Sequence, residues 1–259
     1  MCFNIIKPSV KYIREEKKKR LFFEPPDILP IERITLMEKK RNLWTDNEIE
    51  IVTLDDLKDA VPVNACTFFY NTREKKELSQ EARLRIKEAI ELVKDSYILR
   101  LSGDSEDKVF NYISLIASNK EIYLPFKKYN PSVSEPRSAG GNTRAFGVVK
   151  GLHKNYEKLP GIVRALNARD VEMIYGVSLL EKVKLILIYS ECGTEAMHKN
   201  VNFFQLGSLV LPLRIATASK IPLINLGASD GISKLKHFLT KSTHSYQSTE
   251  VEETDGLDF

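Results

Sequence analysis

Hydrophobic residues change their spacing along the chain near Asn64. Beyond that position, short apolar runs alternate with longer segments in which apolar residues recur every three or four positions. The short runs are typical of buried strands, and the three-to-four spacing indicates amphipathic helices. This pattern predicts strands at 65–70, 97–101, 122–124, 183–189 and 221–226. It predicts helices at 79–94, 105–118, 160–175, 205–219 and 232–239.

The regular alternation of strands and helices predicts the fold class. Consecutive strands that are joined through a helix run parallel, with a right-handed crossover. The run at 183–189 is nearly all apolar, as expected for a strand that is covered on both faces. We therefore expect an α/β, Rossmann-like, mostly parallel five-stranded sheet with helices on both faces, spanning residues 63–240.

The two ends of the chain have a different character. Residues 1–62 form an expected N-terminal extension, with a basic arm at 7–20, a short strand at 48–53 and a helical turn capped by Thr53. Residues 241–259 are rich in acidic side chains and are expected to be a disordered tail. The basic arm is either a solvated segment or a contact for nucleic acid or for a protein partner that binds residues 1–60.

Composition excludes several classes of protein. The longest apolar run is far shorter than the ~20 residues of a membrane span, so no membrane association is expected. The widely spaced Cys2, Cys66 and Cys192 form no disulfide framework, which favours a reducing cytoplasm. The four histidines have no metal-binding spacing, and neither a nucleophile elbow nor a P-loop is present. We expect no catalytic residues, metal or cofactor.

Ligands of parallel sheets collect beyond the carboxyl ends of the strands, which directs attention to the loops there. The turn Ser102–Ser105 (SGDS) could offer backbone N–H groups to a phosphate, or Asp104 could instead cap the following helix. Arg73 follows the first strand and could bind a phosphate or carboxylate, or pair with a neighbouring glutamate. The polar segment 125–152 is either a lid or partner-facing loop, or a disordered insert.

An ordered set of motifs resembles the phage- and prophage-encoded Rossmann-like proteins of the SLOG superfamily, relatives of DNA-processing protein A and of LOG-type folds. The matching segments, over about residues 64–227, are Lys120–Phe126 (KEIYLPF), His153–Leu159 (HKNYEKL), Leu166–Gly176 and Arg214–Leu226. The departures lie in the glycine-rich turns. The family's Gly-Ser-Arg is Asn71–Arg73 here, its second glycine turn is Leu101–Asp107, and its Gly-Gly-Thr lies near Phe204–Ser208.

The resemblance implies a binding protein for a nucleotide or a nucleotide derivative. The implied ligand contacts are Arg73, Ser102, Gly103, Ser105, Arg169 and Ser208. A degenerate phage protein that binds another protein is the alternative. An N-glycosidase acting on a nucleoside monophosphate, with Asp104 or Glu195, ranks lower because the family's catalytic signature is missing. A single-stranded DNA binder would stack bases on Tyr129, Tyr156, Phe203 or Phe204.

Overall fold

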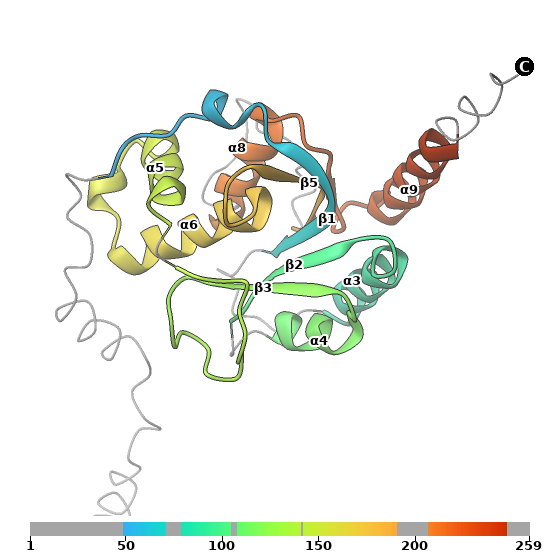
Figure 1. The fold of residues 1–259 in the computed structure, drawn as a ribbon. Coiled ribbons are helices and arrows are strands. Elements are labelled where there is room, and N and C mark those ends of the chain that lie inside the picture. Colours follow the sequence, from blue (N-terminus) through green and yellow to red (C-terminus); the bar gives the residue numbers. More distant parts are fainter. Residues whose placement is uncertain (1–48, 71–78, 105–107, 141, 191–206, 248–259) are drawn as a thin grey trace, which may run out of the picture. The chain divides into compact units, whose positions relative to one another are not determined.

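Six strands make one sheet in which all neighbouring pairs are parallel (Figure 1). The computed structural model describes residues 49–70, 79–104, 108–140, 142–190 and 207–247. The strands are β1 Val61–Tyr70, β2 Ile98–Ser102, β3 Lys120–Leu124, β4 Ser138–Ala139, β5 Glu181–Tyr189 and β6 Leu223–Asn225, in the spatial order β4-β3-β2-β1-β5-β6. The expected Rossmann-like α/β fold is confirmed.

Helices cover both faces of the sheet. They are α3 Gln80–Val93, α4 Lys108–Ile116, α5 Thr143–Leu152, α6 Gly161–Tyr175, α8 Val210–Ala218 and α9 Gly231–Gln247. Short 3₁₀ turns occur at η2 Asp55–Leu57, η3 Tyr156–Lys158 and η4 Gly207–Leu209. Side chains of α3, α4 and α9 share one core with the sheet, and those of α5, α6 and α8 share the core on the other face (Figure 1).

Local sequence signals account for the start of α3 and for the proline within α8. The Ser79 hydroxyl accepts a hydrogen bond from the Ala82 N–H at 3.1 Å, which confirms it as the N-cap of α3. Pro212 lies in the first turn of α8, where the backbone N–H groups have no intrahelical partner and a proline is therefore tolerated. The last helix is longer than predicted, because α9 continues to Gln247, into the segment expected to be a disordered tail.

The segment 125–152 contains two elements that the sequence pattern did not predict. Ser138–Ala139 pairs with the end of β3 as the edge strand β4, and α5 follows directly. The Asn142 side chain caps α5 by accepting a hydrogen bond from the Ala145 N–H at 3.2 Å. The expectation of a continuous lid or disordered insert is therefore wrong for 138–152, where only Gly141 is not described.

Residues 49–53, which we call the strap, lie against α5. A strand was expected at 48–53, but the described residues 49–53 form none and belong to no sheet. A Cβ atom placed on Gly147 would lie 2.2 Å from the Glu50 carbonyl oxygen, so only glycine allows this approach. The Lys150 ammonium also donates to the Ile49 carbonyl at 3.3 Å. An extended segment thus pairs with a helix surface.

The residues after the strap belong to the same core as the sheet. Thr53 and Asp56 cap η2 reciprocally, since the Asp56 carboxylate accepts from the Thr53 N–H at 2.7 Å and the Thr53 hydroxyl accepts from the Asp56 N–H at 3.4 Å. Leu57 and Ala60 are buried in the core that contains α5 and α6. The structural unit that contains all described residues begins at Thr45, before the expected domain boundary at residue 62.

Candidate ligand site at the carboxyl edge of the sheet

The strand order locates the topological switch point between β1 and β5. From β1 the chain proceeds outward through β2, β3 and β4, and from β5 it proceeds to β6 on the other side. The helices that follow β1 and β5, α3 and α8, lie on opposite faces of the sheet, and open α/β sheets bind ligands at such a point. Tyr70 and Tyr189, at the ends of these strands, are paired in register.

Ser208 lies at this switch point. It belongs to η4, which leads into α8, and its hydroxyl donates a hydrogen bond to the carbonyl oxygen of Tyr70 at 3.2 Å. The structure therefore brings the segment before α8 to the end of β1, although 138 residues separate the two in sequence.

Ser102 lies at the end of β2, beside Tyr70. A small pocket between these residues and α4 is otherwise lined by Phe68, Leu101, Val109, Phe110 and Ile113. Its volume is about 10 Å³, which is room for one water molecule. This part of the edge is filled by the protein's own side chains and does not itself accommodate a nucleotide.

Gly103 is required by packing inside the protein. A Cβ atom on it would lie 2.6 Å from Leu124 Cδ2 and 2.7 Å from Ile122 Cγ2. Its N–H donates to the Tyr123 carbonyl at 3.0 Å, which continues the pairing of β2 with β3. The glycine thus lets β2 and β3 approach each other, and its N–H is already engaged in the sheet.

Arg169 projects from the middle of α6 into buried surroundings. Its side chain is 11% exposed, and its Nε and Nη2 atoms donate to Asp170 Oδ1 at 3.0 and 2.7 Å. Burial by itself lowers the pKa of the guanidinium, but the carboxylates of Asp170 and Asp104 and the phenol of Tyr129 outweigh it, so the pKa is raised. Arg169 stays charged and is already neutralised by its neighbour.

Asp104 and Tyr129 bring the loop after β3 to the end of β2. The Tyr129 hydroxyl donates to Asp104 Oδ2 at 3.2 Å, and the Tyr129 ring packs edge-on against Phe126 with centroids 5.1 Å apart. Asp104, Tyr129, Arg169 and Asp170 form what we call the carboxyl-edge cluster. The sequence pointed to Asp104 as a cap of the following helix, and the residues 105–107 that such a cap would contact lie outside the described part of the chain.

Asn225 is a site residue that the sequence reasoning missed. It is fully buried at the end of β6. Its Oδ1 accepts a hydrogen bond from the Ser190 N–H at 3.0 Å, and its Nδ2 donates to the Ser190 carbonyl oxygen at 2.9 Å. Its Oδ1 also accepts from the Gly227 N–H at 2.9 Å. The side chain therefore fixes the carboxyl end of β5. This asparagine belongs to the Arg214–Leu226 segment noted in the sequence, but its role depends on a contact with a residue 35 positions away.

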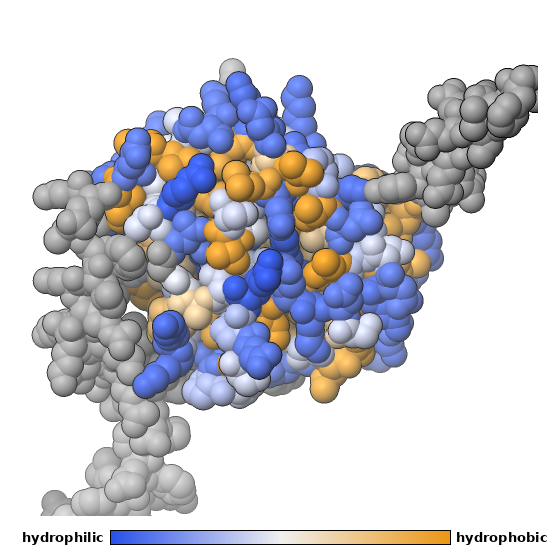
Figure 2. Space-filling model, viewed as in Figure 1, coloured by the Kyte–Doolittle hydropathy of each residue, from blue (hydrophilic) through white to orange (hydrophobic). Residues whose placement is uncertain are grey.

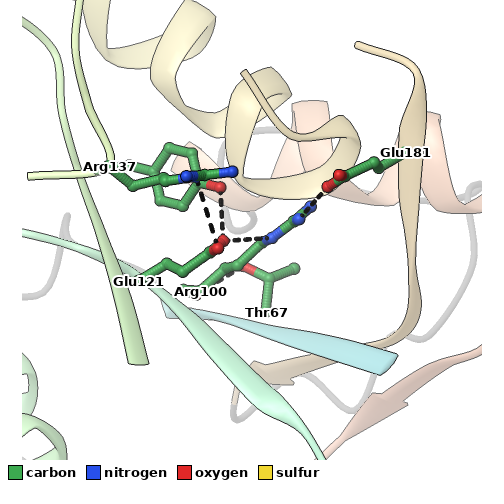
Figure 3. A network of polar contacts seen from close by, with 6 residues as sticks. Thr67, Arg100, Glu121, Arg137 and Glu181 are labelled. Carbon is green, nitrogen blue, oxygen red and sulfur yellow. Dashed lines mark hydrogen bonds and ion pairs between the residues drawn. The ribbon is translucent and has the colours of Figure 1, made fainter. Parts of the chain in front are cut away.

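A second buried arginine lies in the middle of β2 (Figure 3). Arg100 on β2 is 2% exposed and donates to Glu121 at 2.9 Å and to Glu181, the first residue of β5, at 2.5 Å. Tyr123 also donates to Glu121, and Arg137 forms an ion pair with it at 3.5 Å. Burial, together with the Glu121 carboxylate and despite the guanidinium of Arg100, raises the pKa of Tyr123 well above its usual range. The network joins β1, β2, β3 and β5, since the Thr67 hydroxyl donates to the Arg100 carbonyl.

Glu172 ties the end of the 125–142 segment to α6. This buried carboxylate accepts a hydrogen bond from the Ser138 hydroxyl at 2.6 Å. Burial raises the pKa of Glu172, and hydrogen bonds from Ser138 and Asn142 offset this only in part. The same Asn142 donates to the Val177 carbonyl at 2.6 Å, so β4, α5 and the end of α6 share one set of polar contacts.

Several predicted residues lie outside the described part of the chain. They are Arg73, Ser105, Glu195, Phe203 and Phe204. Tyr156 is described and is buried, with the Arg164 guanidinium 5.0 Å from its ring centre, so its ring is packed inside the protein. Within the described residues, no group of histidine, cysteine and acidic side chains is arranged to hold a metal ion.

Fold and site together define an α/β protein of Rossmann-like architecture whose polar side chains gather at the carboxyl edge of a parallel sheet. Among the described helices, none combines the length and the apolar character needed to cross a bilayer. Comparison of the chain with protein-family models, with curated proteins and with solved structures finds no match. Its function must therefore be argued from its own residues.

Proposed function

We propose that this protein is a non-catalytic, SLOG-like binding protein for a nucleotide or a nucleotide derivative. The ligand is held at the carboxyl edge of the sheet, at the switch point between β1 and β5. The observation that carries the proposal is convergence of three residues from distant segments. Ser102 and Ser208 both lie beside Tyr70, and the charge of Asp104, at the end of β2, reaches Arg169 and helps to raise its pKa. Arg73, which follows β1 directly in the sequence, is proposed to bind the phosphate.

The described residues give no support to a hydrolase, and Glu195, one of the two acids considered for it, lies outside them. Cleavage of an N-glycosidic bond needs a positioned carboxylate that is free to react with the substrate. Asp104 accepts a hydrogen bond from Tyr129, and Asp170 is bound by Arg169. A binding role needs no such group.

The described surface gives no particular support to the alternative of a protein partner. On the face in Figure 2, hydrophobic residues are interspersed with hydrophilic ones. The large exposed apolar residues of the described part include Leu84 on α3, Leu115 on α4 and the neighbours Val61 and Leu180, whose backbones share a hydrogen bond. Single exposed apolar residues and small pairs of this kind are normal on protein surfaces. The basic arm that was expected to bind a partner lies outside the described residues.

Thermal unfolding of the full chain with a panel of nucleotides tests the proposal. Mono-, di- and triphosphates, cyclic dinucleotides and ADP-ribose should include at least one ligand that raises the melting temperature saturably. A ligand at 100 times its Kd stabilises by about 2.7 kcal/mol, which for a domain of this size is a rise of roughly 5–10 °C.

Two substitutions of equal charge locate the binding site. Arg73→Ala should abolish most of the rise in melting temperature. Lys58→Ala should leave it intact, because Lys58 is exposed and precedes β1, at the opposite edge of the sheet. No rise with any nucleotide would refute the proposed function, and equal losses in both variants would refute the proposed location.

A further inference from the structure

We propose that Glu172 is a pH-sensitive contact: it holds the edge strand β4 and the start of α5 against α6 while its carboxyl group is protonated, and it releases them when that group ionises. The inference concerns residues 137–146. It goes beyond the proposed function and does not depend on any ligand.

Glu172 joins three elements in a buried setting. It lies in the C-terminal half of α6 and is 2% exposed. The Ser138 hydroxyl of β4 donates to its carboxyl group at 2.6 Å, and the Asn142 side chain donates to it as well. The same Asn142 amide group bonds the Ala145 N–H and the Val177 carbonyl, and it caps α5. A change at Glu172 therefore reaches β4 and the first turn of α5 together.

Glu172 differs from Asp170, the other buried acid of α6. Arg169 donates to the Asp170 carboxylate at 2.7 Å, whereas no cation among the described residues forms an ion pair with Glu172. The two donors to Glu172 are a hydroxyl and an amide, and neither carries a charge. A buried carboxylate without a cation is costly, so the closed arrangement favours the protonated form.

Neighbouring charges do not account for the state of Glu172. Burial raises its pKa, and the hydrogen bonds from Ser138 and Asn142 offset this only in part; no charged group is among the causes. Charged groups on the elements around α6 are Arg100 on β2, Glu121 on β3, Arg137 before β4, Arg144 and Lys150 on α5, Glu181 on β5 and Arg214 on α8. On α6 itself, Arg169 and Asp170 pair with each other.

The direction of the pH effect follows from this shift. In the loosened state the Glu172 carboxyl group meets water and regains its ordinary pKa of 4.5. The stabilising contribution of the contact is therefore complete below that pH and is lost as the pH rises through the raised pKa of the closed state. Between the two pKa values the opening equilibrium increases about tenfold for each pH unit.

The place of β4 in the fold allows it to open without the rest of the sheet. It has two residues, lies at the edge of the sheet and pairs only with the end of β3. Just before it, the Arg137 N–H donates to the Ile122 carbonyl at 2.7 Å. Short edge elements of this kind open locally at a lower free-energy cost than the core.

Hydrogen exchange of the full chain between pH 5 and pH 8, corrected for the intrinsic exchange rates and resolved by NMR, tests the inference. The reporters are the N–H groups of Arg137 and Ala145, which bond Ile122 and Asn142. Their protection should fall as the pH rises, by up to about tenfold per pH unit. Protection of the Tyr97 N–H, which bonds the Val93 carbonyl at the end of α3, should stay constant.

Two substitutions of glutamate by glutamine assign the effect. Glu172→Gln should keep the reporters protected at every pH, because its side chain cannot ionise. Glu135→Gln, at an exposed position in the segment before β4, should retain the wild-type pH dependence. In the wild type, the carbon-13 shift of the Glu172 carboxyl group should titrate above pH 4.5.

Three results would overturn the inference, and each leaves the proposed function untouched. The first is protection of the reporters that does not depend on pH in the wild type. The second is a pH dependence that survives Glu172→Gln, which would assign it to another group such as Asp170. The third is an equal loss of protection at Tyr97, which would show that the whole domain responds.

Discussion

Replacing Gly147 by alanine tests whether the strap is docked on α5. The two glycines of this helix that face the strap are four residues apart, and they differ in how closely the strap approaches. A Cβ atom on Gly147 would lie 2.2 Å from the Glu50 carbonyl oxygen and 2.9 Å from a methyl group of Val52. On Gly151 the nearest atoms would be the Val52 carbonyl oxygen at 3.0 Å and the Cγ2 methyl group of Ile51 at 3.2 Å.

The difference in distance converts into an expected difference in stability. Alanine in place of glycine favours a helix by about 1 kcal/mol in both variants. In Gly147→Ala the strap backbone must retreat by roughly 1 Å, which forfeits up to half of its packing energy. Full burial of Ile49 and Val52 contributes about 1.5–3 kcal/mol each. We expect Gly147→Ala to be destabilised by a net 1–2 kcal/mol or so, and Gly151→Ala to stay within about 0.5 kcal/mol of wild type.

Urea denaturation of the full chain, followed by circular dichroism, measures the two free energies of unfolding. Hydrogen exchange of amides 50–56 measures opening of the strap alone. Faster exchange there in Gly147→Ala, with wild-type exchange in Gly151→Ala, is the expected result. Equal stability of the two variants, together with unchanged strap protection, would refute the docking of the strap on Gly147.

Three other substitutions test the buried polar groups. Arg100→Met should lower the free energy of unfolding by about 3 kcal/mol, because it removes the buried cation that contacts both Glu121 and Glu181. Arg137→Met, at a side chain that is 56% exposed, should cost less than about 1 kcal/mol. A loss for Arg100→Met no larger than that for Arg137→Met would contradict the network. Burial raises the pKa of Glu172, so its stabilising contribution is complete below its ordinary pKa of 4.5 and is lost as the pH rises through the folded-state pKa. Glu172→Gln should therefore be more stable than wild type at pH 8 and equally stable near pH 4. A difference in the free energy of unfolding that stays constant between pH 4 and pH 8 would show that the pKa of Glu172 is not raised by folding. Asn225→Asp should lower the free energy of unfolding by about 2–4 kcal/mol at pH 7, because a carboxylate oxygen would replace the amide group that donates to the Ser190 carbonyl. This loss should be smaller at pH 4, where the introduced carboxyl group is protonated. Melting temperatures of the variant and the wild type at the two pH values test this.

The parts of the fold that could be predicted from the sequence are those in which apolar periodicity reflects burial. All five predicted strands exist, and the Ser79 cap is where the sequence placed it. Strand β4 was not predicted because it has two residues, too few to show a periodic pattern of apolar positions. Helix α5 was not predicted because glycines are typical of loops, whereas here Gly147 and Gly151 allow the strap to approach the helix closely. The alternating residues at 48–53 predicted a strand, but alternation shows only that one side is buried.

The candidate site was predictable in position but not in charge. That Ser102, Arg169 and Ser208 lie near the carboxyl edge follows from the order of the elements. Adjacent residues on a helix do not normally face each other, so nothing in the sequence indicated that Arg169 would bind Asp170. Burial on α6 leaves the guanidinium few other partners, and the ion pair then forms between neighbours.

The contacts of Arg100 and Arg169 serve different parts of the fold. Around Arg100, two arginines and two glutamates balance in charge, although the buried Nη1 atom of Arg100 has no hydrogen-bond partner among the described residues. This network joins β2 to β3 and to β5, which are far apart in sequence. Arg169 instead directs Nε and Nη2 to Asp170 on the same helix. The Arg100 network therefore ties strands of the sheet together, whereas the Arg169 pair compensates a charge within α6.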